Sequence, residues 1–98
     1  MHVLVLISGT GCGCKSVITG RGLRDLVLVV AEGGLAGDLL ASAAKIIVVD
    51  RERPEEGMLR ILAKYPPSLV ISCDEEGKFA PLLNIVRRAC VEVIDACA

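Results

Sequence analysis

The stretch HVLVLISGTGCGCKS, residues 2–16, decides the fold of this chain of 98 residues. Its first half, His2–Ser8, contains the continuous run of leucine and branched apolar residues 3–7. Such a run is typical of a strand that is buried on both faces of a sheet. The strand stops at three closely spaced glycines, and a short helix is expected from Cys14 to about Gly20. A buried strand that leads through a glycine turn into a helix indicates a parallel α/β domain.

The rest of the chain repeats this alternation. We expect further strands at Leu26–Ala31, 45–49, 68–73 and 90–94, and helices at 35–44, 54–65 and 79–89. Strict alternation predicts a parallel sheet with helices on both sides. Right-handed crossovers leave two common strand orders, 3-2-1-4-5 and 2-1-3-4-5, of which we expect the first. The prediction is a single three-layer, Rossmann-like domain over residues 1–98 with a five-stranded parallel sheet.

Composition and charge exclude several classes of protein. The chain is 53% hydrophobic, but its longest uncharged apolar stretches, 3–7 and Leu26–Ala31, have only the length of a strand. A membrane helix needs about 20 such residues, so we expect no membrane insertion and attribute the excess apolar surface to a homo-oligomer. The net charge of −1 and the two aromatic residues Phe79 and Tyr65 argue against nucleic-acid binding. No export signal precedes the first strand, which predicts a cytoplasmic location.

The glycine turn predicts an anion site, because backbone N–H groups and a helix N-terminus converge there. The pattern Gly9-x-Gly11-x-x-Cys14 approaches the dinucleotide fingerprint, and Gly9-x4-Cys14-Lys15-Ser16 approaches a Walker A loop. We favour the first, because the chain is too short for the usual sheet of an ATPase. A glycine turn that binds nothing is the alternative. The residues expected to hold a nucleotide, NAD-like or mononucleotide, are Gly9, Thr10, Gly11, Cys12, Gly13, Lys15 and Ser16 for the phosphate, Glu32 for the ribose, and Asp74 at the end of the fourth strand.

Four of the five cysteines follow the ends of strands that neighbour one another in the expected order. Cys12 and Cys14 follow the first strand, Cys73 ends the fourth and Cys97 follows the fifth, so their thiols are expected at the carboxyl edge of the sheet. Four thiolates would suit zinc or an iron–sulfur cluster. Cys14, beside Lys15 at a helix N-terminus, could instead be a reactive thiol. The remaining interpretation is packing of free thiols in the core, which we also expect for Cys90, and a disulfide framework is not expected.

Parts of the chain resemble known families. The segment SLVISCDEEGKFAPLLNIVRRACVEVIDA, residues 68–96, resembles the nucleotide-binding domains that regulate potassium transport. Residues 60–83 are similar to the domain that precedes the ATP-grasp fold. The VLISGTG start and the KYPPSLVIS stretch resemble the N-terminal halves of formyltransferases. These resemblances imply a Rossmann-like fold and a phosphate-binding loop at Gly9, Gly11 and Gly13, with Glu32 on the ribose. The catalytic Asn and His that formyltransferases carry after the fifth strand have no match at Asp95 or Cys97.

Three functions therefore stay open. The first is a cytoplasmic sensor or accessory subunit that binds a small phosphate-bearing ligand at the first loop. The second is a cysteine-based metal or thiol redox protein at the same sheet edge. The third is an interaction module without catalysis. The sequence identifies no reaction and no catalytic residue, and His2 is its only histidine.

Overall fold

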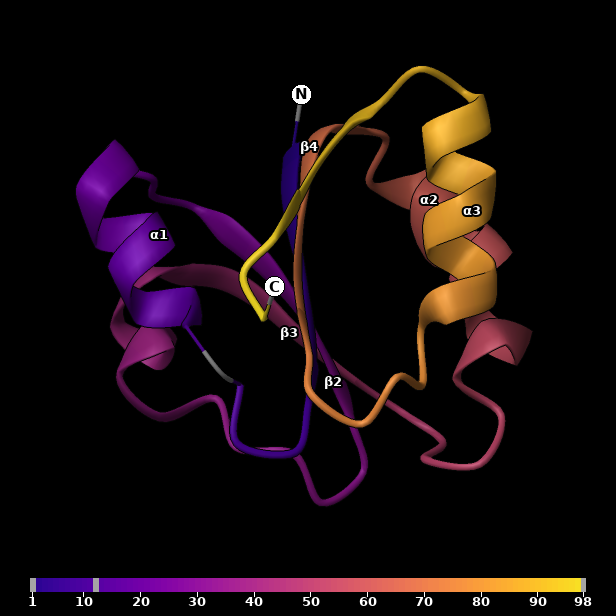
Figure 1. Ribbon diagram of the computed structural model, residues 1–98, viewed down its shortest axis with the longest axis horizontal. Coiled ribbons are helices and arrows are strands. Elements are labelled where there is room, and N and C mark those ends of the chain that lie inside the picture. Colours follow the sequence, from indigo (N-terminus) through magenta and orange to yellow (C-terminus); the bar gives the residue numbers. More distant parts are fainter. Residues whose placement is uncertain (1, 12, 98) are drawn as a thin grey trace.

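The computed structural model describes residues 2–11 and 13–97, which build one five-stranded parallel sheet in the order β3-β2-β1-β4-β5. The strands are β1 (His2–Ser8), β2 (Leu26–Ala31), β3 (Ala43–Val49), β4 (Pro67–Asp74) and β5 (Glu92–Asp95). The predicted α/β class and strand order are confirmed. The carboxyl ends of β1, β2 and β4 point toward the lower part of Figure 1, where the loops that follow them gather.

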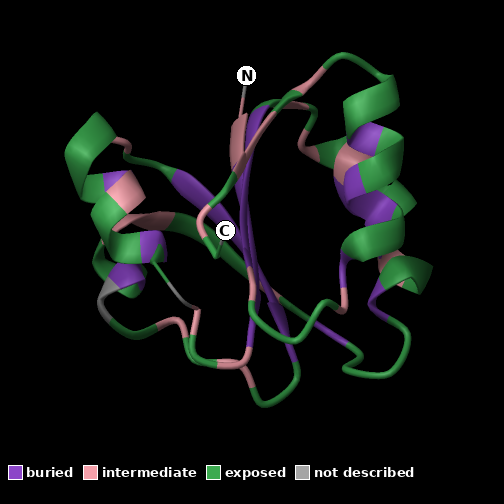
Figure 2. Cartoon of the chain, in the orientation of Figure 1, coloured by how far each residue is buried: buried purple, intermediate pink, exposed green. Residues whose placement is uncertain are grey.

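Helices cover both faces of this sheet. Helix α1 (Cys14–Arg21) and the 3-10 helix η1 (Gly37–Ser42) lie on one face. The 3-10 helix η2 (Pro54–Gly57) leads into α2 (Met58–Lys64), which lies with α3 (Ala80–Arg88) on the other face (Figure 1). Two apolar cores result, one under α1 and η1 and one under α2 and α3. Buried residues run along the three central strands and the inner sides of the helices (Figure 2).

The helix expected over 35–44 is wrong. Only the short η1 forms there, and β3 begins at Ala43 instead of Lys45. The connection between β2 and β3 comprises residues 32–42, whereas a parallel crossover with a full helix takes about a dozen residues or more. Gly37, with a φ of +53°, also interrupts the helical conformation that the alanine and leucine content favours. The alanine-rich composition was therefore a misleading signal.

The core position expected for Cys90 is also wrong. Cys90 is exposed, precedes β5 and adopts a φ of +61°. It follows the end of α3, where its N–H donates to Arg87 O at 3.1 Å. Cys90 thus takes the left-handed position that often ends a helix, and β5 starts at Glu92 because the chain must turn first.

On the α1 face of the sheet, the helices do not cover the outer strand β3. Within the parallel register, Leu28 pairs with Ile46 and Val30 pairs with Val48. The two β2 residues are buried, whereas Ile46 and Val48 are 46% and 63% exposed. The missing crossover helix therefore leaves an apolar strip of the sheet open. Within the described part of the chain, no helix has the length and apolar character needed to cross a membrane.

Candidate functional site

The loop between β1 and α1 is built on left-handed glycines. Gly9, Gly11 and Gly13 have φ values of +64°, +68° and +66°. Residues that carry a Cβ are strained in this conformation, which explains why all three positions are glycine. Gly13 is the N-cap of α1, and no side chain caps that helix. Cys12, a predicted ligand residue, lies outside the described residues.

Each of these glycines also lies close to another part of the chain. A Cβ at Gly13 would be 2.3 Å from the carbonyl oxygen of Ala96, and a Cβ at Gly9 would be 3.2 Å from the Glu75 side chain. A Cβ at Gly11 would be 3.3 Å from the carbonyl oxygen of Leu35. The missing side chains therefore allow close approach of the protein's own segments. The sequence pattern had suggested close approach of a phosphate.

The carboxylates after β4 hold the turn that starts α3. Asp74 accepts hydrogen bonds from the Ser8 hydroxyl at 2.6 Å and from the N–H groups of Lys78 and Phe79 at 2.8 and 2.7 Å. The Ser8 hydroxyl in turn accepts from the N–H of Glu76 at 2.9 Å. Asp74 thus joins the ends of β1 and β4, and three donors occupy its carboxylate.

Glu75, the residue after Asp74, joins the end of β4 to the glycine loop. The Thr10 hydroxyl donates a hydrogen bond to the Glu75 carboxylate, which also lies over Gly9. A negative group of the protein therefore occupies the space beside the first glycine, on the side of β4. An incoming phosphate would have to displace it.

Two predicted cysteines meet at this edge. Cys14, the first residue of α1, and Cys73, the last apolar residue of β4, form a disulfide with a Cα–Cα distance of 5.6 Å. Their side chains are 2% and 0% exposed. The expectation that these cysteines are free thiols is wrong. The disulfide forms because Cys73 pairs with Ile7 of β1, so the loop that follows β1 returns α1 to the same end of β4.

Ala96, the residue before Cys97, contacts the same edge of the sheet through its backbone. The Ala96 N–H donates to the carbonyl oxygen of Ser72 at 2.9 Å, and the Ala96 carbonyl lies against Gly13. Cys97 is itself disulfide-bonded, and its N–H donates to the Asp95 carboxylate at 3.0 Å. Among residues 2–11 and 13–97, Cys90 is the free cysteine.

Two hollows lie at this edge of the sheet. One, of about 290 Å³, lies between the loop and the connection after β2, with walls that include Thr10, Gly11, Cys14, Lys15, Leu35 and Leu39. The other, also about 290 Å³, lies between the ends of β4 and β5 and α3, with walls that include Ser72, Asp74, Asn84, Arg87, Asp95 and Cys97. Ser16 and Glu32, both exposed, line neither hollow.

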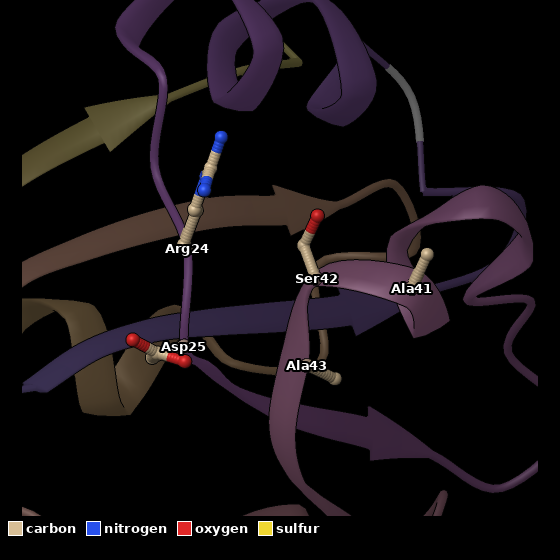
Figure 3. A pocket seen from close by; sticks show the side chains of 5 residues that line it. All are labelled: Arg24, Asp25, Ala41, Ser42 and Ala43. Atoms are coloured by element: carbon tan, nitrogen blue, oxygen red, sulfur yellow. The ribbon is translucent and has the colours of Figure 1, made fainter.

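A third hollow, of about 280 Å³, lies at the opposite edge of the sheet, before β2 and β3. Figure 3 shows the Arg24 guanidinium and the Ser42 hydroxyl on one side of it, with the Asp25 carboxylate pointing away from both. Ligands of doubly wound sheets gather at the carboxyl ends of the strands. The candidate site is therefore the edge that carries the glycine loop.

Sequence reasoning missed the protein groups that fill this edge. These are Ser8, Leu35, Glu75 and Ala96, which contact the loop or its neighbouring strand end. Ser8 gave a signal in the sequence, because it is a polar residue at the end of an apolar run. In the structure it is completely buried. Ala96 makes its contact through the backbone, so its residue type gave no sign of that contact.

Comparisons with protein-family models, with curated proteins and with solved structures found no match. The resemblances to transport regulators, pre-ATP-grasp domains and formyltransferases therefore stay predictions. Within the described ranges, no three histidine, cysteine or carboxylate side chains are grouped so that they could hold a metal ion.

Proposed function

We propose that this chain is a thiol–disulfide redox domain whose reactive group is the Cys14–Cys73 pair. The observation that carries the proposal is the position of this disulfide, which ties the glycine loop and the start of α1 to the end of β4. The two cysteines are 59 residues apart in sequence, and they meet at the edge of the sheet where Rossmann-like domains bind their ligands.

The register of the sheet supports a switching role for the pair. Cys73 pairs with Ile7 in the β1–β4 ladder, and the disulfide joins Cys73 to Cys14 at the far end of the loop. The loop is therefore held at both ends. Reduction releases one end and leaves the β1–β4 ladder and both cores in place. The disulfide thus controls the loop more than it controls the fold.

The two sulfurs differ in their accessibility to a reductant. Cys14 borders the hollow beside Leu35, whereas Cys73 is completely buried. A reductant would therefore attack Cys14. Because Cys14 is only 2% exposed, a shift of the loop or of Leu35 must accompany the attack, and we expect slow reduction. The position of Cys14 at the start of α1 stabilises the thiolate that reduction produces.

The exchange is balanced with a dithiol as reductant. Its first thiolate attacks the Cys14 sulfur, the bond to Cys73 breaks, and Cys73 leaves as a thiolate that takes up a proton. The second thiolate of the reductant attacks the mixed disulfide, closes the reductant's own disulfide and releases Cys14. Two electrons pass from the dithiol to the pair, and its two protons end on the two cysteines. The cytoplasmic location predicted from the sequence suits such a switch, because that compartment is reducing.

A redox titration tests the proposal. The Cys90→Ser variant, which removes the exposed free thiol, is equilibrated in glutathione buffers. The oxidised fraction of Cys14 and Cys73 is measured by thiol alkylation and peptide mass spectrometry, which separates it from the disulfide of Cys97. A redox-active pair is expected to titrate between about −180 and −270 mV, the range of known exchange proteins. A pair that stays oxidised below about −300 mV would be a structural cross-link, and the proposal would be abandoned.

A phosphate-bearing ligand is the second candidate, favoured by the hollow of about 290 Å³ that Thr10, Gly11 and Lys15 help to line. A nucleotide there would place its phosphate near the start of α1. The test is thermal unfolding with NAD, ATP or inorganic phosphate, for wild type and Lys15→Gln. Stabilisation by a nucleotide that is weaker in the variant supports this candidate. No stabilisation by any of the three probes argues against it.

A further inference from the structure

Cys97 places a second disulfide in the wall of the hollow between α3 and the ends of β4 and β5. This cysteine is disulfide-bonded and exposed, and the hollow that it lines has a volume of about 290 Å³. The Cys14–Cys73 disulfide lies in the core under α1, on the other face of the sheet. The disulfide of Cys97 is therefore the more accessible of the two to a molecule in solution.

Two polar side chains of α3 line the same hollow. Asn84 and Arg87 are three residues apart, so the helix presents them on one face. Within residues 2–11 and 13–97, neither the Asn84 amide nor the Arg87 guanidinium takes part in a hydrogen bond or an ion pair. A guanidinium binds a carboxylate through two parallel N–H groups. The hollow thus offers an amide and a cationic fork to a molecule that enters it.

The two carboxylates in this wall differ in their availability. Asp74 already accepts three hydrogen bonds from the protein. Asp95 is exposed and accepts from the backbone N–H of Cys97 at 3.0 Å. A carboxylate has about four lone-pair sites, so Asp95 can accept further hydrogen bonds from a cation. Arg87 and Asp95 together therefore match a molecule that carries both a carboxylate and an ammonium group.

We propose that this hollow binds a small peptide thiol of the glutathione type and that the thiol forms a mixed disulfide with Cys97. The Arg87 guanidinium binds a carboxylate of the thiol, the Asn84 amide bonds to its peptide group, and Asp95 accepts from its ammonium group. The volume of about 290 Å³ is close to the lower limit of small-ligand sites, about 300 Å³, and suits a molecule of this size. The inference goes beyond the proposed function, because the disulfide under α1 takes no part in it.

The step is a thiol–disulfide exchange. The thiolate of the bound molecule attacks the Cys97 sulfur, a new S–S bond forms, and the existing disulfide breaks. The sulfur that leaves keeps the electron pair of the broken bond and takes up the proton that the entering thiol lost. One thiol is consumed and one is released, so the step needs no further oxidant or reductant. Arg87 acts on the capture of the thiol, and the bond exchange itself is the chemistry of the sulfurs.

The test follows mixed-disulfide formation in oxidised, full-length Cys90→Ser protein. Glutathione or the uncharged thiol 2-mercaptoethanol is added, alkylation stops the reaction, and peptide mass spectrometry locates the adduct, which is expected at Cys97. Arg87→Gln is expected to lower the rate with glutathione roughly fivefold, the effect of one close charge pair in water, and to leave the rate with 2-mercaptoethanol unchanged. Arg88→Gln is the matched control, because it removes the same charge from an exposed residue of α3 outside the hollow.

Three results would overturn the inference. They are an equal loss of rate in Arg87→Gln and Arg88→Gln, a loss in Arg87→Gln that is the same for both thiols, and the absence of an adduct at Cys97. The first would mean that only net charge matters, and the second that recognition of the thiol is not involved. The redox titration of Cys14 and Cys73 is measured on other peptides, so failure of one proposal leaves the other standing.

Discussion

The carbonyl oxygen of Ala96 occupies the space that a side chain at Gly13 would need, 2.3 Å from an ideal Cβ. Gly13 has a φ of +66° and caps α1, and Ala96 follows the last strand of the sheet. This contact closes the carboxyl edge by joining the first loop of the chain to its last turn. The third glycine of the loop is thus required by the fold itself, whatever ligand the loop binds.

Gly13→Ala is expected to lower the free energy of unfolding by about 3 kcal/mol. A left-handed alanine costs about 1–2 kcal/mol, and overpacking against backbone adds a similar amount. Urea denaturation gives the value. Gly33→Ala isolates the first effect, because Gly33 has a φ of +86° and open space around its Cβ position. Gly20→Ala, in α1 with neither constraint, should stabilise the helix by up to about 1 kcal/mol. Equal effects at positions 13 and 33 would mean that the Ala96 contact is unimportant.

Ser8→Ala is expected to destabilise the chain by about 1–3 kcal/mol. The Ser8 hydroxyl is buried, donates to Asp74 and accepts from Glu76 N, so its removal leaves both partners short of a hydrogen bond. Ser68→Ala is the matched control, because Ser68 is exposed and bonds to His2 O only at 3.4 Å. Thermal unfolding of both variants would separate the two positions. A loss below about 0.5 kcal/mol for Ser8→Ala would show that the network adds no stability.

The sheet was predictable because its strands carry their own signal. His2–Ser8 and Leu26–Ala31 are apolar runs bounded by glycine, serine or charge, and such runs fit only strands that are covered on both faces. Handedness of the crossovers then limited the order of the strands. The helix expected over 35–44 was wrong because alanine content is a local preference. The length of the connection, which is a property of the whole sheet, decided the outcome.

The candidate site was predictable only in part. The meeting of Cys14 and Cys73 follows from strand order, since β1 and β4 are neighbours whose carboxyl ends lie together. No sequence motif predicted that the protein's own residues would occupy the space beside the loop glycines. Gly9 and Gly13 accommodate Glu75 and Ala96, and a glycine pattern does not say whether a phosphate or the protein's own chain approaches it. Only the packed structure distinguishes these cases.

Reduction of the Cys14–Cys73 disulfide is expected to cost stability while the fold is retained. The bridge closes a loop between residues 59 apart, and loop-closure entropy for that length corresponds to about 4 kcal/mol. The double variant Cys90→Ser/Cys97→Ser lacks the second disulfide, and its urea denaturation with and without a phosphine reductant measures the difference. We expect a lower midpoint and a single cooperative transition in both states. Loss of cooperativity on reduction would contradict a switch that acts on the loop alone.

Removal of the Glu75 carboxylate tests whether the glycine loop can bind an anion. Glu75 accepts from Thr10 and lies over Gly9, so its charge repels a phosphate at the loop. Glu75→Ala is expected to raise the affinity for ATP or inorganic phosphate roughly fivefold, the effect of about 1 kcal/mol at a solvated position. Glu76→Ala, which removes a carboxylate paired with Arg51, is the charge-matched control. Isothermal titration calorimetry would show an equal response of the two variants if only net charge mattered.

The open strip of the sheet at β3 predicts self-association. Ile46 and Val48 continue the apolar face of Leu28 and Val30 but lie beyond the cover of η1. The strand is also the edge of the sheet, so its outer hydrogen-bonding groups have no partner strand in the described part of the chain. A second copy offers the same edge and the same apolar strip, and edge strands of this kind pair readily. The homo-oligomer predicted from composition is therefore expected to form through β3.

If wild type associates through β3, Val48→Lys should give a monomer in sedimentation velocity, because a charged side chain cannot be buried in such a contact without a partner. Leu59→Lys, at a 69% exposed position on α2 in the opposite layer, should leave the expected association intact. The two substitutions add the same charge, so a difference between them locates the interface. Dissociation by Leu59→Lys alone would move the interface to the α2 layer. A monomeric wild type at all concentrations would mean that the exposed strip is tolerated without a partner, as single exposed apolar residues often are.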